Sequence, residues 1–208
     1  MDASVELGPP GMSVAVGDHI CAFYRGSAGR DEILLPYLRA GIEAGHKCIA
    51  ILDGIERDTV QARLRDDCDV EGAIQTRQLD LLCSSETYLR DGHFSKVAML
   101  DFWSEVVGEC IDGSNYEFAR SVGEMTWALS QLPGVEDLVD YESELNRFLP
   151  LYPQVILCLY DLDCFVGRII VDLMRTHPKL LLCGSILDNP YYLEPDEFLS
   201  RGSPVLSR

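Results

Sequence analysis

The alternation of apolar strands with helices is the feature that most constrains this fold, and it begins near the start of the chain. Residues 18–24 are rich in β-branched and aromatic side chains, which predicts a strand. Residues 25–30 contain two glycines and predict a short flexible loop. Acidic residues then open a helix that ends near Ala44, and the apolar run 47–52 predicts a second strand. Two strands joined through a helix form a βαβ unit, so we expect a parallel sheet here.

The same alternation continues along the rest of the chain. Further helices are predicted at 55–66, 95–111, 135–148 and 165–176, and further strands at 75–83, 116–122, 154–160 and 179–183. The run 154–160 is the most hydrophobic, which favours a central strand buried on both faces. The pattern predicts one α/β domain with a doubly wound, mostly parallel sheet flanked by helices. We expect an irregular N-terminal segment at 1–16, either a tail or an edge segment, a single domain at 17–200 and a C-terminal tail at 201–208.

Composition excludes several classes of function. Of the 208 residues, 47% are hydrophobic, which is enough to bury the core of one large domain. The chain has no apolar run long enough to span a membrane and no basic leader of the secretory type, so we expect a cytoplasmic protein. The formal net charge is −17, which disfavours direct binding of nucleic acid or an anionic membrane and would favour a basic partner.

The eight cysteines predict free thiols. No Cys-x-x-Cys motif occurs, and most of the cysteines fall in apolar runs, where cysteine behaves as a small hydrophobic residue. The close ligand spacing of structural zinc sites is also missing. We therefore expect no metal site and no cofactor from the sequence.

Polar and aromatic side chains gather where the predicted strands end. Ligand sites in open parallel sheets form at the carboxyl ends of the strands. Glu124 is the first candidate, because it follows a strand that is predicted to break at Gly123; the alternative is that it caps a following helix. The candidate ligand-binding residues are His19, Cys21, Tyr24, Arg30, Glu86, Tyr88, Glu124, Met125, Trp127, Tyr160, Asp161 and His177. Met125 and Trp127 have packing as their alternative role, and His177 is expected at the opposite end of the sheet.

The loop at 25–30 lies in the position of a phosphate-binding P-loop but lacks the residues of that motif. Gly29 matches the second glycine and Arg30 the lysine of Gly-x-x-x-x-Gly-Lys-[Ser/Thr], but Tyr24 replaces the first glycine. Asp31 stands where a magnesium-binding hydroxyl belongs, and its carboxylate would repel a triphosphate. Hydrolysis of nucleoside triphosphates is therefore disfavoured, while binding of a nucleotide without hydrolysis stays open.

Nine short motifs follow one another in an order that resembles a known family. They are His19-Ile20-Cys21-x-x-Tyr24, Arg30, Leu35-Pro36-x-Leu38, Glu86-Thr87-Tyr88-Leu89, Gly123-Glu124-Met125-Thr126-Trp127-Ala128-Leu129, Tyr141-Glu142-x-x-Leu145-Asn146, Cys158-x-Tyr160-Asp161, Thr176-His177-Pro178 and Asn189-Pro190-Tyr191-Tyr192. Together they resemble the MEDS domain, the sensory domain of methanogen and methylotroph regulators, named partly for the dichloromethane-responsive repressor. The resemblance covers about residues 17–199.

The resemblance implies a fold and a role. The implied fold is a RecA-like three-layer sandwich, akin to the circadian-clock ATPases but with a decayed P-loop. The implied role is the sensing of small molecules, such as one-carbon or hydrocarbon derivatives, for an output domain. The sequence shows no helix-turn-helix or kinase module, so we expect a separate signalling partner, such as a kinase, an anti-sigma factor or a regulator. RecA-like relatives often form rings, so the resemblance also implies self-association.

Three functions remain open on the sequence alone. The first is a stand-alone sensory or regulatory domain that binds a small molecule at the carboxyl edge of its sheet and signals to a partner protein. The second is a non-catalytic RecA-like scaffold that oligomerises or docks a partner without a ligand. The third is an enzyme that uses Glu86 and Glu124 as acid and base, although the two carboxylates could equally be unrelated helix caps.

Overall fold

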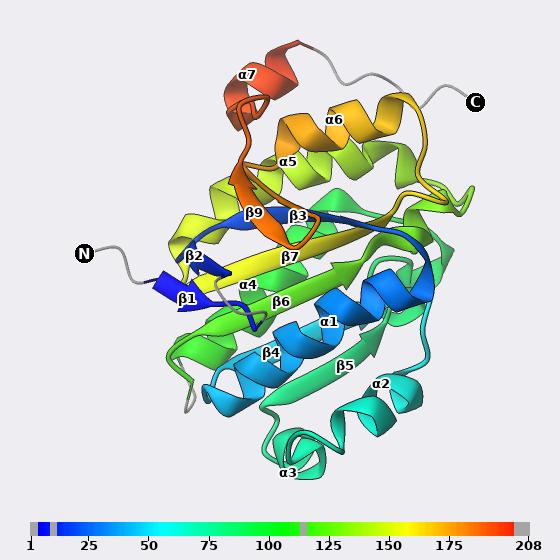
Figure 1. The fold of residues 1–208 in the computed structure, drawn as a ribbon. Helices are drawn as coiled ribbons and strands as arrows, with labels where there is room; N and C mark the ends of the chain where they lie inside the picture. The colour runs from blue at the N-terminus through cyan, green and yellow to red at the C-terminus, as the bar shows by residue number, and fades with distance from the viewer. Residues whose placement is uncertain (1–3, 9–11, 113–115, 202–208) are drawn as a thin grey trace.

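A seven-stranded sheet forms the centre of the computed structural model, which describes residues 4–8, 12–112 and 116–201 (Figure 1). In spatial order the strands are β5 (Leu79–Cys83), β4 (Lys47–Leu52), β6 (Ala119–Glu124), β7 (Gln154–Asp161), β3 (His19–Tyr24), β8 (Lys179–Leu182) and β9 (Ser185–Asp188). All neighbours pair in parallel except β9, which returns antiparallel to β8. The predicted doubly wound, mostly parallel sheet is confirmed.

Helices cover both faces of the sheet. The face toward the reader in Figure 1, here the front face, carries α1 (Gly26–Glu43), α2 (Arg57–Leu64) and α3 (Val70–Gln75). The back face carries α4 (Lys96–Asp112), α5 (Leu138–Phe148) and α6 (Arg168–Thr176), and α7 (Pro195–Ser200) packs on α5. Short 3₁₀ turns link them at Ser84–Glu86, Arg90–Gly92, Met125–Leu129, Val135–Asp137 and Leu149–Leu151. No helix in the described ranges is long and apolar enough to cross a membrane.

The pleat of the strands divides the interior into two cores. Successive side chains of a strand point to opposite faces, so Ile20 and Ala22 of β3 enter the front core while Cys21 enters the back core. The predicted central strand, β7, lies fourth of the seven and is buried along nearly its whole length. Cys21 pairs in register with Cys158 of β7, so two thiols lie side by side on the back face.

Two short strands near the N-terminus replace part of the predicted irregular tail. β1 (Ser4–Glu6) and β2 (Ser13–Ala15) form an antiparallel ribbon. Leu7 and Val14 are buried in the front core, and their hydrophobic burial holds the two strands against α1 and the sheet. The other predicted tail, 201–208, lies outside the described residues except for Arg201.

Four further elements differ from those predicted. α1 begins at Gly26, so the glycine segment is its first turn and no loop of 25–30 exists. β6 runs through Gly123 to Glu124 instead of ending before them. The unpredicted helix α3 is capped by Asp69, whose carboxylate accepts from the Gly72 amide at 3.0 Å. β9 is also absent from the predicted elements, because its four residues are mostly exposed and carry no apolar pattern.

Candidate functional sites

The carboxyl edge of the sheet holds a buried carboxylate, Glu124, at the end of β6. Its Oε1 accepts from the Tyr24 hydroxyl at 3.0 Å. Its Oε2 accepts from the Asp53 amide at 3.2 Å and from the Gly54 amide. The Thr126 hydroxyl donates as well, at 2.8 Å. We call these five residues the carboxyl-edge network. Glu124 directly precedes the 3₁₀ turn Met125–Leu129, but its side chain makes no capping hydrogen bond; it joins the ends of β3, β4 and β6 instead.

The start of α1 does not fit a nucleotide phosphate. Arg30, at the position of the P-loop lysine, is 6% exposed and binds the Gly54 carbonyl at 2.9 Å and the Asp31 carboxylate at 3.0 Å. The Asp161 carboxylate accepts from the Gly26 amide at 3.3 Å. A phosphate at a helix N-terminus needs free backbone amides and a positive potential. At the start of α1, the Asp161 carboxylate already accepts from the Gly26 amide and brings a negative charge.

Tyr88, Met125 and Trp127 pack into the back core. The rings of Tyr88 and Trp127 stack with centroids 4.5 Å apart, and Phe94 and Tyr141 complete the aromatic cluster. All five side chains are buried. Met125 and Trp127 therefore have the packing role that was the alternative to ligand binding.

Glu86 and Glu124 have separate surroundings. The Glu86 side chain is 57% exposed and forms an ion pair with Arg57 at 3.3 Å. Glu124 is fully buried and satisfied by the donors of the carboxyl-edge network. The two carboxylates do not form the acid–base pair that their positions in the sequence suggested.

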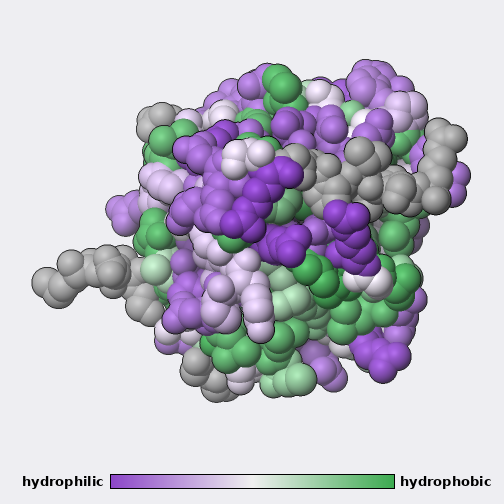
Figure 2. Space-filling view, turned by 90° about the horizontal axis from the view of Figure 1, so that it is seen from above, coloured by the Kyte–Doolittle hydropathy of each residue, from purple (hydrophilic) through white to green (hydrophobic). Residues whose placement is uncertain are grey.

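A groove opens beside the carboxyl-edge network, between α1 and β8. It holds about 390 Å³ and its walls are mostly apolar. Its lining residues, which define the α1–β8 groove, are Met12, Phe23, Tyr24, Arg25, Gly29, Glu32, Ile33, Leu162, Leu181, Leu182, Cys183 and Gly184. Figure 2, a view from above, shows hydrophobic residues gathered along the side that faces the reader in Figure 1, the side on which α1 lies.

A second polar cluster lies under α5 on the back face. It consists of His19 at the start of β3, Glu142 in α5, Cys158 in β7 and His177 between α6 and β8. All four side chains are buried, and one possible ligand atom from each lies within 4.8 Å of the others. We call it the His–Glu–Cys–His cluster.

The Glu142 carboxylate is the centre of this cluster. Its Oε2 lies 3.1 Å from His19 Nε2, 3.3 Å from His177 Nε2 and 3.6 Å from Cys158 Sγ. His19 Nε2 also lies 3.4 Å from Cys158 Sγ. The Tyr160 hydroxyl donates to Oε1 at 2.7 Å, so the carboxylate is fixed from its other side.

Burial controls the protonation of the cluster. Burial, with a smaller contribution from the nearby His177, lowers the pKa of His19 to about 4, although Glu142 opposes this change. Burial also raises the pKa of the Cys158 thiol well above its usual range, and Glu142 adds to that effect. Both shifts favour the uncharged side chain in the absence of another cation.

Apart from the packed Tyr88, Met125 and Trp127 and the exposed Glu86, the predicted site residues fall into two groups. Tyr24, Arg30, Glu124 and Asp161 lie at the carboxyl edge. His19 lies instead at the amino end of β3, because it is the first residue of that strand, and it contacts His177. The back-face group also includes Cys21 and Tyr160 from the predicted set. The site residues that sequence reasoning did not select are Thr126, Glu142, Asn146 and Cys158. The sequence feature that could have indicated the back-face cluster is the spacing of Glu142 and Asn146, which lie four residues apart on one helix.

Comparison with known proteins identifies the family. The family described as MEDS, the "MEthanogen/methylotroph, DcmR Sensory domain", matches residues 18–178. The chain belongs to the MEDS family. Transcriptional repressor DcmR of Methylorubrum extorquens (strain DSM 6343 / CIP 106787 / DM4) is 32% identical over 169 residues, which are 80% of this chain and 60% of the relative. The MEDS chain thus spans about 60% of the length of that repressor.

Solved structures with low sequence identity share the RecA-like fold. The KaiC-like protein PH0186 of Pyrococcus horikoshii OT3 superposes with a TM-score of 0.64 at 13% identity, over 86% of this chain and 80% of that protein. The flagellar accessory protein FlaH of Methanocaldococcus jannaschii gives 0.57 at 10% identity, over 89% and 84%. These likenesses confirm the predicted RecA-like architecture.

Proposed function

We propose that this MEDS chain is a cytoplasmic sensory domain that binds a small, largely apolar molecule in the α1–β8 groove and signals to a separate regulatory protein. One observation carries the proposal. Tyr24 is a wall of the groove and also donates its hydroxyl hydrogen bond to the buried Glu124. A molecule in the groove therefore touches a residue that is bonded to the carboxyl-edge network.

The carboxyl-edge network gives the groove a route to the rest of the molecule. A ligand that displaces the Tyr24 ring changes one of the donors of Glu124. Glu124 also accepts hydrogen bonds from the amides of Asp53 and Gly54, which follow β4. The same carboxylate thus links the groove to a loop at the end of another strand, and a ligand that prefers one arrangement of that loop shifts the population toward it.

The lining of the groove indicates the chemistry of its ligand. Phe23, Ile33 and Leu181 provide apolar surface, which suits a hydrocarbon portion. Arg25 lies at the rim but is paired with Asp163 at 2.8 Å, so it offers little free charge. We infer a largely apolar, uncharged ligand.

The role that we propose is regulatory and not enzymatic. DcmR is a transcriptional repressor, and the family is a sensory one. The net charge of −17 favours a basic protein partner over direct contact with DNA. The Asp161 carboxylate at the start of α1 supports a sensor that does not hydrolyse nucleotides.

A titration followed by NMR tests the groove. The ¹⁵N-labelled protein is titrated with a panel of one- to four-carbon alcohols and halides. We expect at least one compound to shift amide resonances around the groove and, through Glu124, those of Asp53 and Gly54. Leu162→Glu places a charge at the groove and should abolish the shifts. Val171→Glu is the matched control, since Val171 is an exposed residue on α6 outside the groove, and it should leave them unchanged.

A further variant separates ligand binding from coupling. Tyr24→Phe keeps the ring but removes the hydroxyl that reaches Glu124. The groove shifts should persist in this variant while those of Asp53 and Gly54 disappear. Shifts at Asp53 and Gly54 that match those of the unaltered protein would contradict the proposed route, and a panel that produces no groove shifts would contradict the proposed site.

A further inference from the structure

We propose that the His–Glu–Cys–His cluster binds a divalent transition-metal ion of the zinc type. This site lies on the back face, away from the α1–β8 groove, and it goes beyond the proposed sensory function. It also replaces our expectation from the sequence that the chain has no metal site. That expectation depended on spacing along the chain, whereas these ligands come from four separate segments.

The separations of the ligand atoms fit a tetrahedral ion. Zinc lies about 2.0 Å from nitrogen or oxygen and about 2.3 Å from sulfur, so a tetrahedron has N–O edges of about 3.3 Å and N–S or O–S edges of about 3.5 Å. The two N–O separations to Glu142 Oε2 are 3.1 and 3.3 Å. The N–S separation is 3.4 Å and the O–S separation is 3.6 Å. These four of the six edges agree with the expected values, and every pair of ligand atoms lies within 4.8 Å.

Because His19 Nδ1 donates a hydrogen bond, the lone pair of its Nε2 faces the cluster. The Asn146 amide nitrogen donates to the carbonyls of Glu142, Ser143 and Thr176, which fixes the orientation of the amide. Asn146 Oδ1 therefore faces His19 Nδ1, at 3.2 Å, and that nitrogen must carry the hydrogen. In a neutral imidazole the other nitrogen, Nε2, is then an acceptor.

His177 has the same arrangement of donor and lone pair. Its Nδ1 lies 2.7 Å from the Leu173 carbonyl oxygen, which can only accept, so Nδ1 is the donor. Its Nε2 is buried and has no hydrogen-bond partner among the described residues, although Glu142 Oε2 is 3.3 Å away. Two lone pairs and a carboxylate thus converge in a buried space. A cation among them turns this unfavourable arrangement into a ligand set.

The surrounding contacts are those that metal ligands need. Each ligating histidine donates its remote N–H to a fixed oxygen, Asn146 Oδ1 for His19 and the Leu173 carbonyl for His177. The Tyr160 hydroxyl orients the carboxylate of Glu142. Such outer contacts hold the ring planes and the carboxylate toward a common point.

The donor set also selects the class of ion. Two imidazole nitrogens, one thiolate and one carboxylate suit zinc or a similar transition-metal ion, whereas calcium and magnesium prefer oxygen ligands. Four protein ligands complete a tetrahedron, and the side chains are fully enclosed. The geometry therefore indicates a structural ion that joins β3, β7, α5 and the α6–β8 connection. As the ion binds, the Cys158 thiol releases its proton to solvent and its sulfur becomes a thiolate ligand.

Cobalt spectroscopy tests the site on the full chain. The protein is unfolded with a chelator, refolded with Co²⁺ alone, and its absorption is recorded. We expect the strong visible bands of tetrahedral Co²⁺ and a thiolate-to-cobalt charge-transfer band in the near ultraviolet. Cys158→Ser should remove the charge-transfer band. Cys48→Ser is the matched control, because Cys48 is equally buried but lies in the front core, and it should retain the band.

A third variant tests the outer contacts. Asn146→Leu removes the acceptor for His19 Nδ1 and should weaken Co²⁺ binding roughly 10- to 100-fold without removing the charge-transfer band at saturation. The proposal is overturned if the unaltered protein gives no tetrahedral cobalt spectrum, if Cys158→Ser keeps the charge-transfer band, or if Cys48→Ser loses it. The spectrum of the unaltered protein is itself decisive, so the proposal can be refuted even where a variant fails to fold.

Discussion

Two fully buried glutamates differ sharply in what surrounds them. Glu124, at the end of β6, accepts hydrogen bonds from two backbone amides and two hydroxyl groups. Glu142, in α5, faces two histidine nitrogens that have lone pairs in their neutral forms, and a cysteine sulfur. The Tyr160 hydroxyl donates a hydrogen bond to the Glu142 carboxylate. Both carboxylates are 0% exposed, so burial alone does not distinguish their roles.

The difference shows how to interpret a buried carboxylate. Donors that surround Glu124 compensate for its lost hydration, so the carboxylate is complete within the protein. Glu142 accepts from the Tyr160 hydroxyl and weakly from the Cys158 thiol, but the histidine lone pairs beside it cannot donate, and the proposed cation would complete that arrangement. The first glutamate suits a coupling element beside a ligand groove, and the second suits an ion ligand. Variants of the two residues should therefore behave differently.

The largest effect is expected for Glu142→Gln. This change removes the negative charge from the His–Glu–Cys–His cluster and leaves an amide among buried lone pairs. We expect a loss of about 3–5 kcal/mol in the free energy of unfolding, because one partner of a buried charged group is removed. Urea unfolding of the protein with its ion bound measures it. A chelator should lower the unfolding midpoint of the unaltered protein but should have little further effect on the variant.

A smaller effect is expected for Glu124→Gln. The amide keeps the shape of the side chain, but its nitrogen must replace one of the two oxygens, so it faces either the Gly54 amide, which donates to Oε2, or the Tyr24 hydroxyl, which donates to Oε1. We expect a loss of about 2 kcal/mol, which is the usual size for hydrogen bonds to a charged group. The same urea experiment measures it. Here the chelator should lower the midpoint as much as in the unaltered protein, and a variant insensitive to chelator would break the distinction between the two glutamates.

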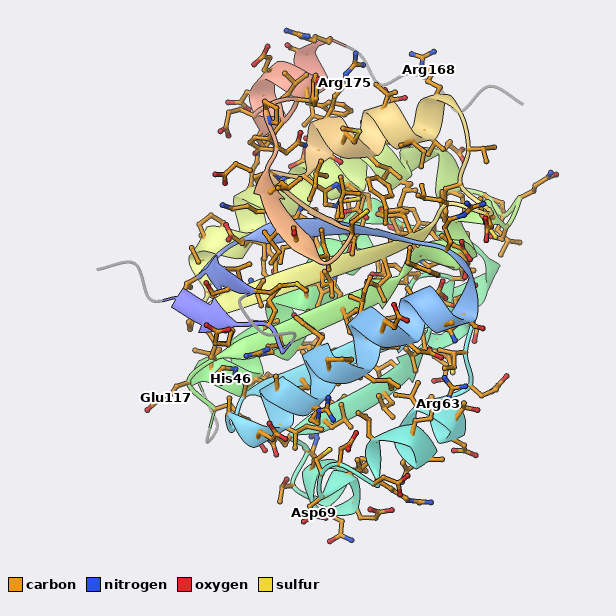
Figure 3. The ribbon with its side chains drawn as sticks, viewed as in Figure 1. His46, Arg63, Asp69, Glu117, Arg168 and Arg175 are labelled. Carbon is orange, nitrogen blue, oxygen red and sulfur yellow. The ribbon has the colours of Figure 1, made fainter. Side chains whose placement is uncertain are left out.

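The smallest effect concerns His46, a histidine outside both regions. It lies just before β4 (Figure 3), and its Nδ1 accepts from Arg120 Nε at 2.9 Å. Burial, and then the charge of Arg120, lowers the pKa of His46 from 6.5 to about 4. Between these two pH values the unfolded chain therefore binds more protons than the folded one. The contribution of His46 to stability is complete above pH 6.5 and is lost as the pH falls toward 4.

His46→Gln should flatten the pH dependence of stability in that window. The measurement compares urea midpoints at about pH 7 and about pH 5 for the variant and the unaltered protein. Other titrating groups are common to both proteins, so the difference between their two slopes isolates His46. Equal slopes would mean that the pKa of His46 is the same in the folded and unfolded chains.

The sequence predicts the large elements because their signals are local. The residues of β7 are identified as a central strand by their continuous hydrophobicity. β1 and β9 escape prediction, since strands of three or four residues carry too little pattern. The early start of α1 escapes it as well, because Gly26 and Gly29 usually mark loops.

The candidate sites are harder to predict because they depend on tertiary contacts. The position of Glu124 at a strand end is visible in the sequence, but the four donors that complete it are not. His19 and Glu142 lie far apart along the chain, and only the packing of α5 on the back face of the sheet brings them together. No spacing rule for metal ligands covers such a distance along the chain.

Metal content tests the central contrast most directly. Elemental analysis by plasma mass spectrometry is applied to the unaltered protein, Glu124→Gln and Glu142→Gln, each purified without added metal or chelator. We predict about one transition-metal ion per chain, mainly zinc, in the first two proteins and a small fraction of that in Glu142→Gln. Equal metal content in the two variants, or none in the unaltered protein, would contradict the assignment of different roles to the two buried glutamates.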